Sequence, residues 1–271
     1  MNAKPEHEGR MPVLFVGHGS PTNAIEDNEF TRGWRDIART LPRPKAILCI
    51  SAHWETRGAL VTATDEPRTI HDFGGFPREL YEARYPAPGS SWLARETCRI
   101  VKTADVGLDH EWGLDHGCWV PLRWMFPEAD IPVVELSLDY SKPAQAHYDL
   151  ARELAPLRDD GVLIVGSGNI VHNLRLVVLR SNSLSDFHQP FGLDWALEAG
   201  ALFKRLMDEG RHRELIDYQA LGEAARLAVP TPEHYLPLLY ALALKRDDET
   251  ITYFNDKPVA GSVTMTSLLI R

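Results

Sequence analysis

The sequence is poor in cysteine and contains no long apolar segment. Its three cysteines, Cys49, Cys98 and Cys118, are an odd number at spacings that match no disulfide framework or zinc motif, so we expect buried free thiols. No apolar run approaches the ~18 residues that a membrane-spanning helix needs. The polar start, MNAKPEHEGR, lacks the apolar core of a signal peptide. These absences predict a cytoplasmic protein that does not enter a membrane.

The sequence also has fewer basic than acidic residues. The 271 residues carry 38 acidic and 29 basic side chains, a formal net charge of −9, and no basic run is visible. This balance argues against a nucleic-acid backbone or an anionic membrane as the main partner. The chain has no obvious linker or repeat, so we predict a single domain over residues 1–271, with residues 1–11 as a flexible N-terminal segment.

Strand and helix patterns alternate along the chain. Strands are predicted at 12–16, 46–51, 59–64, 132–138, 161–167, 251–254 and 262–270. Helices are predicted at 27–41, 90–104, 142–157, 191–210 and 231–245. Asp27 or Asn28 caps the first of these helices, Thr231 caps the last, and Gly210 follows a helix end. The pattern predicts a single α/β domain with a central, largely parallel or mixed sheet and helices on both faces.

Two of the buried runs stop at a histidine. LFVGHGSP ends the first at His18, and CISAHW ends the second at His53. Ligands of open α/β sheets bind at the carboxyl ends of strands, and neighbouring strands would bring both imidazoles to one edge. A turn histidine that bonds a carbonyl is the ordinary alternative at each position. The repetition favours a metal site, because imidazole is a ligand for Zn, Cu, Fe and Ni.

Two further histidines have the same potential. His172 follows the third buried strand in GVLIVGSGNIVHN, and a parallel sheet would bring it to the same edge. His234 lies in the first turn of the predicted helix 231–245, where the helix dipole disfavours a charged ring. A capping role for His172 and an exposed structural role for His234 remain open. Spacing alone does not unite these sites.

Three stretches without clear periodicity are predicted as long loops: 65–90, 105–118 and 181–191. The first two are rich in aromatic residues, histidine and glycine, which favours a functional role. His71 in TIHDFGGFP and His116 in GLDHGCWVPL are candidates for substrate contact or proton transfer. His110 is expected to be a solvated neighbour of His116.

Seven segments together resemble the class III extradiol ring-cleaving dioxygenases: LFVGHGSP, ISAHW, TIHDFGGFP, YPAPGS, LDHGCWVPL, GSGNIVHNLR and TPEHYLPLLYAL. The branch that they resemble is that of the 4,5-DOPA dioxygenase-like proteins. The resemblance runs from about residue 12 to the C-terminus. It implies an oxidoreductase that opens the ring of a catechol such as 4,5-DOPA with O2, in one α/β domain that holds one mononuclear divalent metal, Zn or Fe(II).

The resemblance also implies roles for single residues. His18 and His53 correspond to two metal ligands, and His234 corresponds to the third, where protocatechuate-cleaving relatives have a carboxylate. His172 corresponds to the catalytic acid–base histidine, with a fourth metal ligand as its other candidate role. Its ordinary pKa near 6.5 would suit proton transfer in both directions. His116 is the second candidate for proton transfer.

Substrate contacts are expected from His71, Phe76 and Tyr235, with core or loop packing as the alternative for each aromatic ring. Three neutral imidazoles leave a metal more electron-poor than a set with a carboxylate, and all-nitrogen ligation is familiar for zinc. Two other functions therefore stay open. One is a tetrapyrrole metal chelatase, which shares a VGHGS-like segment but does not predict SAHW, IHDFGGFP or TPEHYLPL. The other is a zinc-binding protein without oxygenase activity. Monomer and homo-oligomer are both open.

Overall fold

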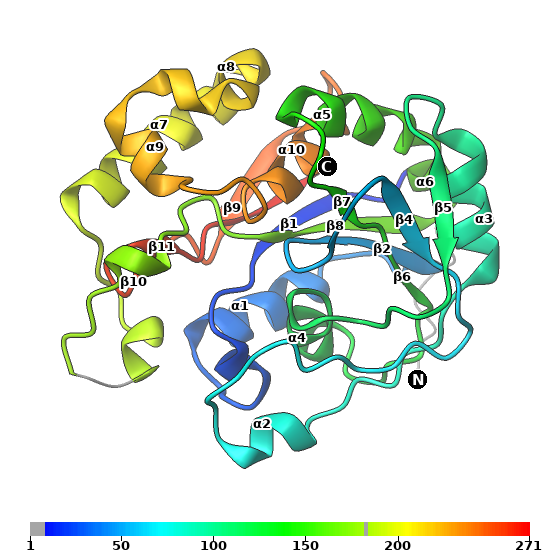
Figure 1. Ribbon diagram of the computed structural model, residues 1–271, viewed down its shortest axis with the longest axis horizontal. Coiled ribbons are helices and arrows are strands. Elements are labelled where there is room, and N and C mark those ends of the chain that lie inside the picture. Colours follow the sequence, from blue (N-terminus) through cyan, green and yellow to red (C-terminus); the bar gives the residue numbers. More distant parts are fainter. Residues whose placement is uncertain (1–8, 182–183) are drawn as a thin grey trace.

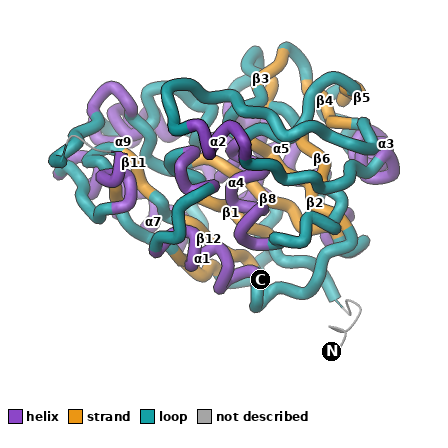
Figure 2. Tube along the Cα trace, turned by 90° about the horizontal axis from the view of Figure 1, so that it is seen from below, coloured by secondary structure: helices purple, strands orange, loops and turns teal. Residues whose placement is uncertain are grey.

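A mixed six-stranded sheet forms the centre of the protein (Figure 1). The computed structural model describes residues 9–181 and 184–271. In the order β6-β2-β8-β1-β12-β9, the strands are Val133–Glu135, Ala46–Ser51, Val162–Gly168, Val13–Gly17, Ser267–Ile270 and Ile251–Phe254. The first four are parallel, and β12 and β9 continue the sheet antiparallel. Figure 2 shows β1, β8, β2 and β6 side by side. The predicted α/β class with a mixed sheet is confirmed.

Short strand pairs lie outside the main sheet. They are β3 (Glu55–Thr56) with β7 (Leu138–Asp139), β4 (Ala59–Thr62) with β5 (Val106–Asp109), and β10 (Pro258–Val259) with β11 (Val263–Thr264). The strand predicted at 262–270 is therefore two strands. The chain leaves the sheet at Met265, whose N–H is donated to the Lys257 carbonyl.

The helices cover both faces of the sheet. They are α1 (Glu29–Ala38), α2 (Arg78–Glu82), α3 (Ser91–Ile100), α4 (His116–Met125), α5 (Ala144–Glu153), α6 (Ala155–Asp159), α7 (Asp194–Asp208), α8 (His212–Ile216), α9 (Glu223–Ala228) and α10 (Leu236–Ala243). Short 3-10 segments are η1 (Pro21–Ala24), η2 (Leu174–Leu176), η3 (Leu184–His188) and η4 (Tyr218–Leu221).

Two predicted helix ends are confirmed and one is wrong. Asn28 caps α1 in a capping box, and Gly210 follows α7 with a φ of 68°. Thr231 does not cap the last helix. That helix, α10, begins at Leu236 and has Tyr235 at its N-cap position. The residues before it form a separate turn, in which the Tyr235 N–H is donated to the Pro232 carbonyl.

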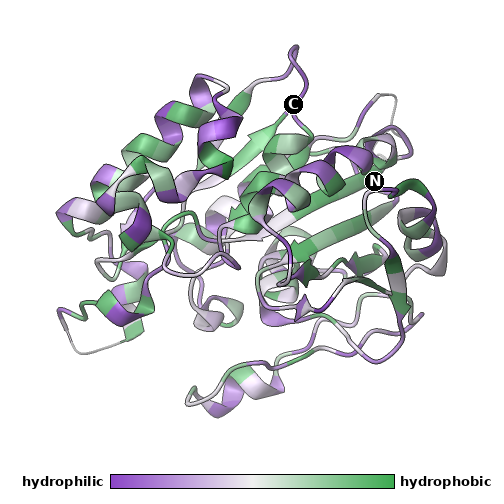
Figure 3. Ribbon diagram, turned by 45° about the horizontal axis from the view of Figure 1, so that its top comes forward, coloured by the Kyte–Doolittle hydropathy of each residue, from purple (hydrophilic) through white to green (hydrophobic). Residues whose placement is uncertain are grey.

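Alternate side chains of the strands point to opposite faces of the sheet, as strand geometry requires. On β1, Val13 and Phe15 pack into the core shared with α5 and α10, whereas Leu14 and Val16 pack into the core shared with α1 and α4. Figure 1 shows these helix pairs on opposite sides of the sheet, and Figure 3 shows the hydrophobic strands between them.

The remaining sequence expectations have mixed outcomes. Residues 1–8 of the predicted flexible segment lie outside the described residues, whereas Met11 is fully buried and donates its N–H to the Arg158 carbonyl. All three cysteines are free, as predicted, but only Cys49 and Cys118 are buried, whereas Cys98 is partly exposed. Within residues 9–181 and 184–271, none of the helices combines the length and hydropathy that a bilayer span would need.

Candidate metal centre

Four histidines meet at the carboxyl edge of the parallel strands, and we call them the histidine cluster: His18, His53, His116 and His234. His18 directly follows β1, and His53 lies two residues after β2. The expectation that β1 and β2 are neighbours is wrong, because β8 lies between them. The two histidines still meet, because all three strands are parallel and end at the same edge.

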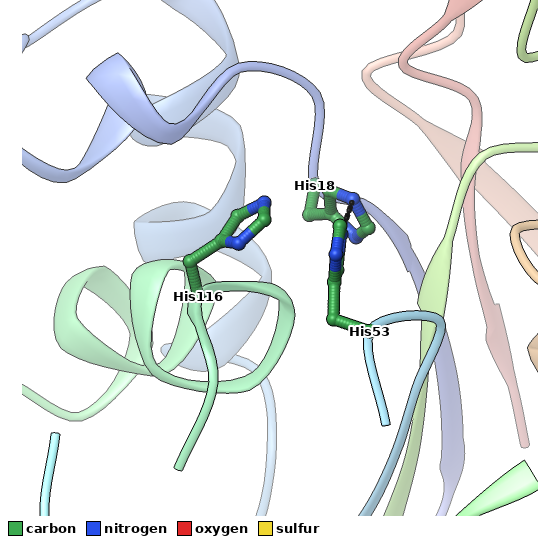
Figure 4. Close-up of side chains that lie close together, drawn as sticks. All are labelled: His18, His53 and His116. Atoms are coloured by element: carbon green, nitrogen blue, oxygen red, sulfur yellow. Dashed lines mark hydrogen bonds between the residues drawn. The ribbon is translucent and has the colours of Figure 1, made fainter. Parts of the chain in front are cut away.

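Three members of the cluster bring their nitrogen atoms close together. Nε2 of His18 and Nε2 of His53 are 3.1 Å apart, a separation that suits two nitrogens each about 2.0–2.1 Å from one metal. His116 is the first residue of α4, and its ring centroid lies 3.8 Å from that of His53. One ligand atom from each of these three lies within 4.8 Å of the others. Figure 4 shows the three rings converging from separate elements.

His234 forms a second group of three rings with His18 and His53. The ring centroids of His18, His53 and His234 are 4.9, 5.3 and 5.0 Å apart, which is a nearly equilateral triangle. The ring of His172 stacks on that of His234, with 3.6 Å between the two centroids. His172, His234 and Glu233 form a second group of metal-ligand type. The sequence-predicted histidines 18, 53, 116, 172 and 234 are thus together.

A hydrogen-bond relay sets the tautomer of His18. Pro121 has no N–H to donate to the carbonyl four residues earlier in α4, so the Gly117 carbonyl is free to accept from Ser167 Oγ at 2.5 Å. The single hydroxyl proton of Ser167 is used there. Its oxygen therefore accepts the proton of His18 Nδ1 at 3.1 Å, and His18 Nε2 keeps its lone pair for the centre of the cluster.

Carboxylates orient two other rings in the same way. Asp72 accepts from His116 Nδ1 at 2.8 Å and from the His116 N–H at 2.9 Å. Burial alone would raise the pKa of Asp72, but the hydrogen bonds from His116 bring it below its usual value. Glu233 accepts from His234 Nδ1 at 3.2 Å. Burial opposes ionisation there too, yet hydrogen bonds from His234, its own backbone and Thr231 lower the pKa of Glu233 to about 2.

Burial keeps the rings neutral. Desolvation, followed by the neighbouring histidines, lowers the pKa of His18 and His53 well below 6.5. Burial also lowers the pKa of His234, against the effect of Glu233, and lowers that of His172 to about 2. Burial therefore moves the pKa of His172 away from the ordinary value near 6.5. Ligand nitrogens of His18, His53 and His116 lie within 4.8 Å of one another, and imidazole nitrogens are a donor set that fits a divalent metal.

A cavity of about 310 Å³ opens over the cluster, and we call it the histidine cavity. Its walls carry the four cluster histidines and His172, together with apolar residues: Phe76, Leu174, Leu184, Phe187 and Val263. Phe76 reaches the cavity, as the substrate-contact prediction requires. The histidine cavity is small and mostly apolar.

His71 and Tyr235, the other predicted substrate contacts, do not line this cavity. His71 Nε2 lies 2.9 Å from the Ala83 carbonyl, and the ring packs against Trp119. Tyr235 is fully buried in the core, where its hydroxyl donates to the Leu215 carbonyl at 2.9 Å. The sequence does not show which way an aromatic ring beside a histidine points, and in the structure Tyr235 follows the core-packing alternative.

Sequence reasoning missed the polar residues that support the histidines. Asp72 and Glu233 directly adjoin His71 and His234 in the sequence, which is the one signal that marked them. Asp115 caps α4 and accepts from Ser51 Oγ at 2.6 Å, while its N–H is donated to Glu135 at 2.9 Å. Burial, reinforced by their mutual repulsion, raises the pKa of Glu135 well above its usual value.

Comparisons with known proteins match most of the chain. Residues 11–263 match the family described as the catalytic LigB subunit of aromatic ring-opening dioxygenase. The chain is 47% identical over 262 residues to a 4,5-DOPA dioxygenase extradiol of Escherichia coli (strain K12), which covers 96% of this chain and 95% of the relative. It is 40% identical to a protein of the same name from Beta vulgaris, over 85% of each chain.

A solved structure gives the same result for the fold. It is the crystal structure of an uncharacterised Escherichia coli K12 protein, 41% identical, with a TM-score of 0.83 over 97% of this chain and 100% of the other. The sheet, the converging histidines and the match over most of the sequence lead to one assignment. The chain belongs to the LigB family of aromatic ring-opening dioxygenases and is an extradiol ring-cleaving enzyme.

Proposed function

We propose that this enzyme opens the ring of a catechol such as 4,5-DOPA with O2, and that His18, His53 and His234 hold its single divalent metal, Zn or Fe(II). The observation that carries the assignment is the nearly equal-sided triangle of these three rings at the end of the histidine cavity. These three histidines would hold the metal at the cavity, where a substrate could reach it.

The metal, when bound, brings the catechol oxygens and O2 together and lets electron density pass between them. The side chains of the cavity do the rest. His172 lies on the cavity wall, so its ring nitrogen would accept a phenolic proton as the substrate binds and return it as the ring opens. His116, oriented by Asp72, is the second group that moves or holds a proton.

Apolar walls favour a flat aromatic substrate and exclude water. Phe76, Phe187 and Val263 face the same space as the histidines. A cavity of about 310 Å³ is at the small end of the range for ligand pockets, roughly 300–1,000 Å³. This volume suits a single ring with a short side chain better than a tetrapyrrole, which argues against the chelatase alternative.

The decisive experiment is anaerobic reconstitution of the metal-free protein with Fe(II), followed by a panel of catechols that includes DOPA, and then air. We expect oxygen consumption that depends on the catechol, together with a yellow ring-opened product. His18→Ala should lose both metal and turnover. His110→Ala is the matched control, because His110 is an exposed histidine outside the cavity, and it should keep both.

Absence of product from every catechol after Fe(II) loading would overturn the proposal. The all-nitrogen ligand set favours one second candidate, a zinc-binding protein without oxygenase activity. That protein would bind Zn tightly and consume no oxygen with any catechol after Fe(II) reconstitution. Insertion of Co(II) or Fe(II) into a tetrapyrrole would instead support the chelatase.

A further inference from the structure

A second cavity, larger than the first, lies on the α1 and α4 side of the sheet. Its volume is about 710 Å³, against about 310 Å³ for the histidine cavity, and the two share no lining residue. Four arginines line it: Arg35, Arg39, Arg84 and Arg123. Among the residues that the structure describes, no carboxylate lines it. We call it the arginine cavity.

Two of these guanidinium groups lack a carboxylate partner. Within the described chain, Arg84 and Arg123 form no salt bridge, and carbonyl groups hold them instead. Arg84 Nη1 donates to the Tyr81 carbonyl at 2.6 Å, and Arg123 Nη1 donates to the Arg84 carbonyl at 2.8 Å. Their positive charges are therefore positioned but not neutralised.

The other two arginines pair only at the protein surface. Arg35 lies 3.2 Å from Asp27, and Arg39 lies 2.8 Å from Asp36. Exposed pairs of this kind are weak and are screened by salt, so an incoming anion competes with them easily. The four arginines make this cavity locally positive in a chain whose net charge is −9.

The walls of the arginine cavity are fixed by packing and by hydrogen bonds. The Arg35 guanidinium lies 4.9 Å from the ring centroid of Trp124, whose Nε1 donates to the Asn23 carbonyl at 2.6 Å. Tyr85 is buried in the wall and donates its hydroxyl to the Phe126 carbonyl at 3.1 Å. Packing and hydrogen bonds therefore hold the walls of the arginine cavity in place.

We propose that the arginine cavity is a binding site for a small polyanion that carries a phosphate group or several carboxylates. The planar fork of a guanidinium matches both groups with paired hydrogen bonds. Four arginines from α1, α4 and the segment after α2 line a volume that is ordinary for a small-molecule ligand. The site does not depend on the metal or on the ring-opening reaction.

The direct test is calorimetric titration of the metal-loaded protein with adenosine 5′-monophosphate, and with benzene-1,3,5-tricarboxylate, whose carboxylates lie too far apart to chelate a metal. We expect saturable binding with one molecule per chain, weakened as salt is raised. Binding of both probes supports a general polyanion site, and binding of one assigns the site to that chemical class. Adenosine, which lacks the charge, should not bind over the same concentrations.

Variants separate this site from the rest of the molecule. Arg84→Gln and Arg123→Gln should each weaken binding about tenfold, the effect of losing a charged hydrogen-bond donor. Arg123→Lys, which keeps the charge, should recover part of that loss. Arg152→Gln is the matched control, because Arg152 is an exposed arginine of α5 outside the cavity, and it should bind like the original protein.

Three results would overturn the proposal: no saturable binding of either probe, binding that Arg84→Gln and Arg123→Gln leave unchanged, or binding that disappears in His18→Ala. The last result would put the probe at the histidine cluster. Because these readouts need no turnover, they stay informative even if the proposed catechol chemistry fails.

Discussion

The ring of His172 lies parallel to that of His234, with 3.6 Å between the centroids and 10° between the planes. The stack puts His172 beside the triangle of His18, His53 and His234. It thereby separates a group that can move protons from the groups that can hold a metal, although both line the same cavity.

Metal content should distinguish these two roles. His172→Gln is expected to keep its metal while turnover falls by about 10²–10⁴, the usual contribution of a general acid or base. His234→Ala is expected to lose metal and turnover together, because a ligand is removed. Elemental analysis of dialysed protein, alongside oxygen uptake, measures both. Metal retained by His234→Ala but lost from His116→Ala would instead make His18, His53 and His116 the ligand set.

Asp72 should act on catalysis through His116. Asp72→Asn keeps an oxygen for His116 Nδ1 but removes the negative charge, so we expect kcat/KM to fall about 10- to 100-fold, as for other groups that orient an active-site histidine. The pH profile of kcat/KM should shift as well, which a purely structural role would not cause. Asp65→Asn, an exposed carboxylate of the same segment, serves as the control. A normal profile in Asp72→Asn contradicts the role.

The metal-free protein should lose stability in mild acid. Burial lowers the pKa of His18, His53, His172 and His234, so these rings stay neutral in the folded protein. The unfolded chain takes up protons below pH ~6.5, and the free energy of unfolding therefore falls as the pH drops below that value, by up to ~1.4 kcal/mol per pH unit and histidine. Urea denaturation at several pH values between about pH 7.5 and about pH 5 measures how steeply the free energy of unfolding depends on pH.

A matched pair of variants tests the origin of this slope. His172→Gln should make it shallower, because the pKa of His172 in the folded protein is lowered to about 2 and its contribution persists across the whole range. His110→Gln removes an exposed histidine and should leave the slope unchanged. Equal slopes in all three proteins would show that other groups govern the acid sensitivity.

The close approach of β8 to the His234 turn predicts a different kind of defect. A Cβ at Gly168 would lie 2.1 Å from the His234 carbonyl oxygen, so Gly168→Ala must push this turn away from the cluster. We expect the free energy of unfolding to fall by about 1–3 kcal/mol and metal affinity to fall with it. Gly200→Ala, in α7 with open space around it, should be neutral or stabilising by up to about 1 kcal/mol. Urea denaturation and metal titration of both variants decide the matter.

The fold class could be read from the sequence because β2 and β8 are almost continuous apolar runs, and because His18 and His53 end their strands abruptly. Strand order could not be read, since hydrophobic pattern reports burial and not the neighbouring strand. The position of β8 between β1 and β2 depends on pairing between strands that are far apart in the sequence.

The sequence predicts a loop over 105–118 and no helix over 119–125, whereas the structure has α4 at His116–Met125, and this difference has a physical reason. Gly117 and Pro121 both have low helix propensity, so the local sequence disfavours a helix here. The fold nevertheless requires glycine at position 117, because a Cβ there would lie 2.4 Å from Ser51 Oγ. Tertiary contacts thus override local preference. The arginine cavity could not be predicted from the sequence either, because its four arginines are far apart along the chain and come together only in the fold.

The place of β8 in the sheet also sets an order of assembly during synthesis. β1 and β2 leave the ribosome early, yet the strand that joins them is made much later, and His234 follows later still. A nascent chain therefore presents His18 and His53 as separate imidazoles with no shared geometry. With the proposed ligand set of His18, His53 and His234, the metal would bind only after the domain is complete, and it would therefore not nucleate folding.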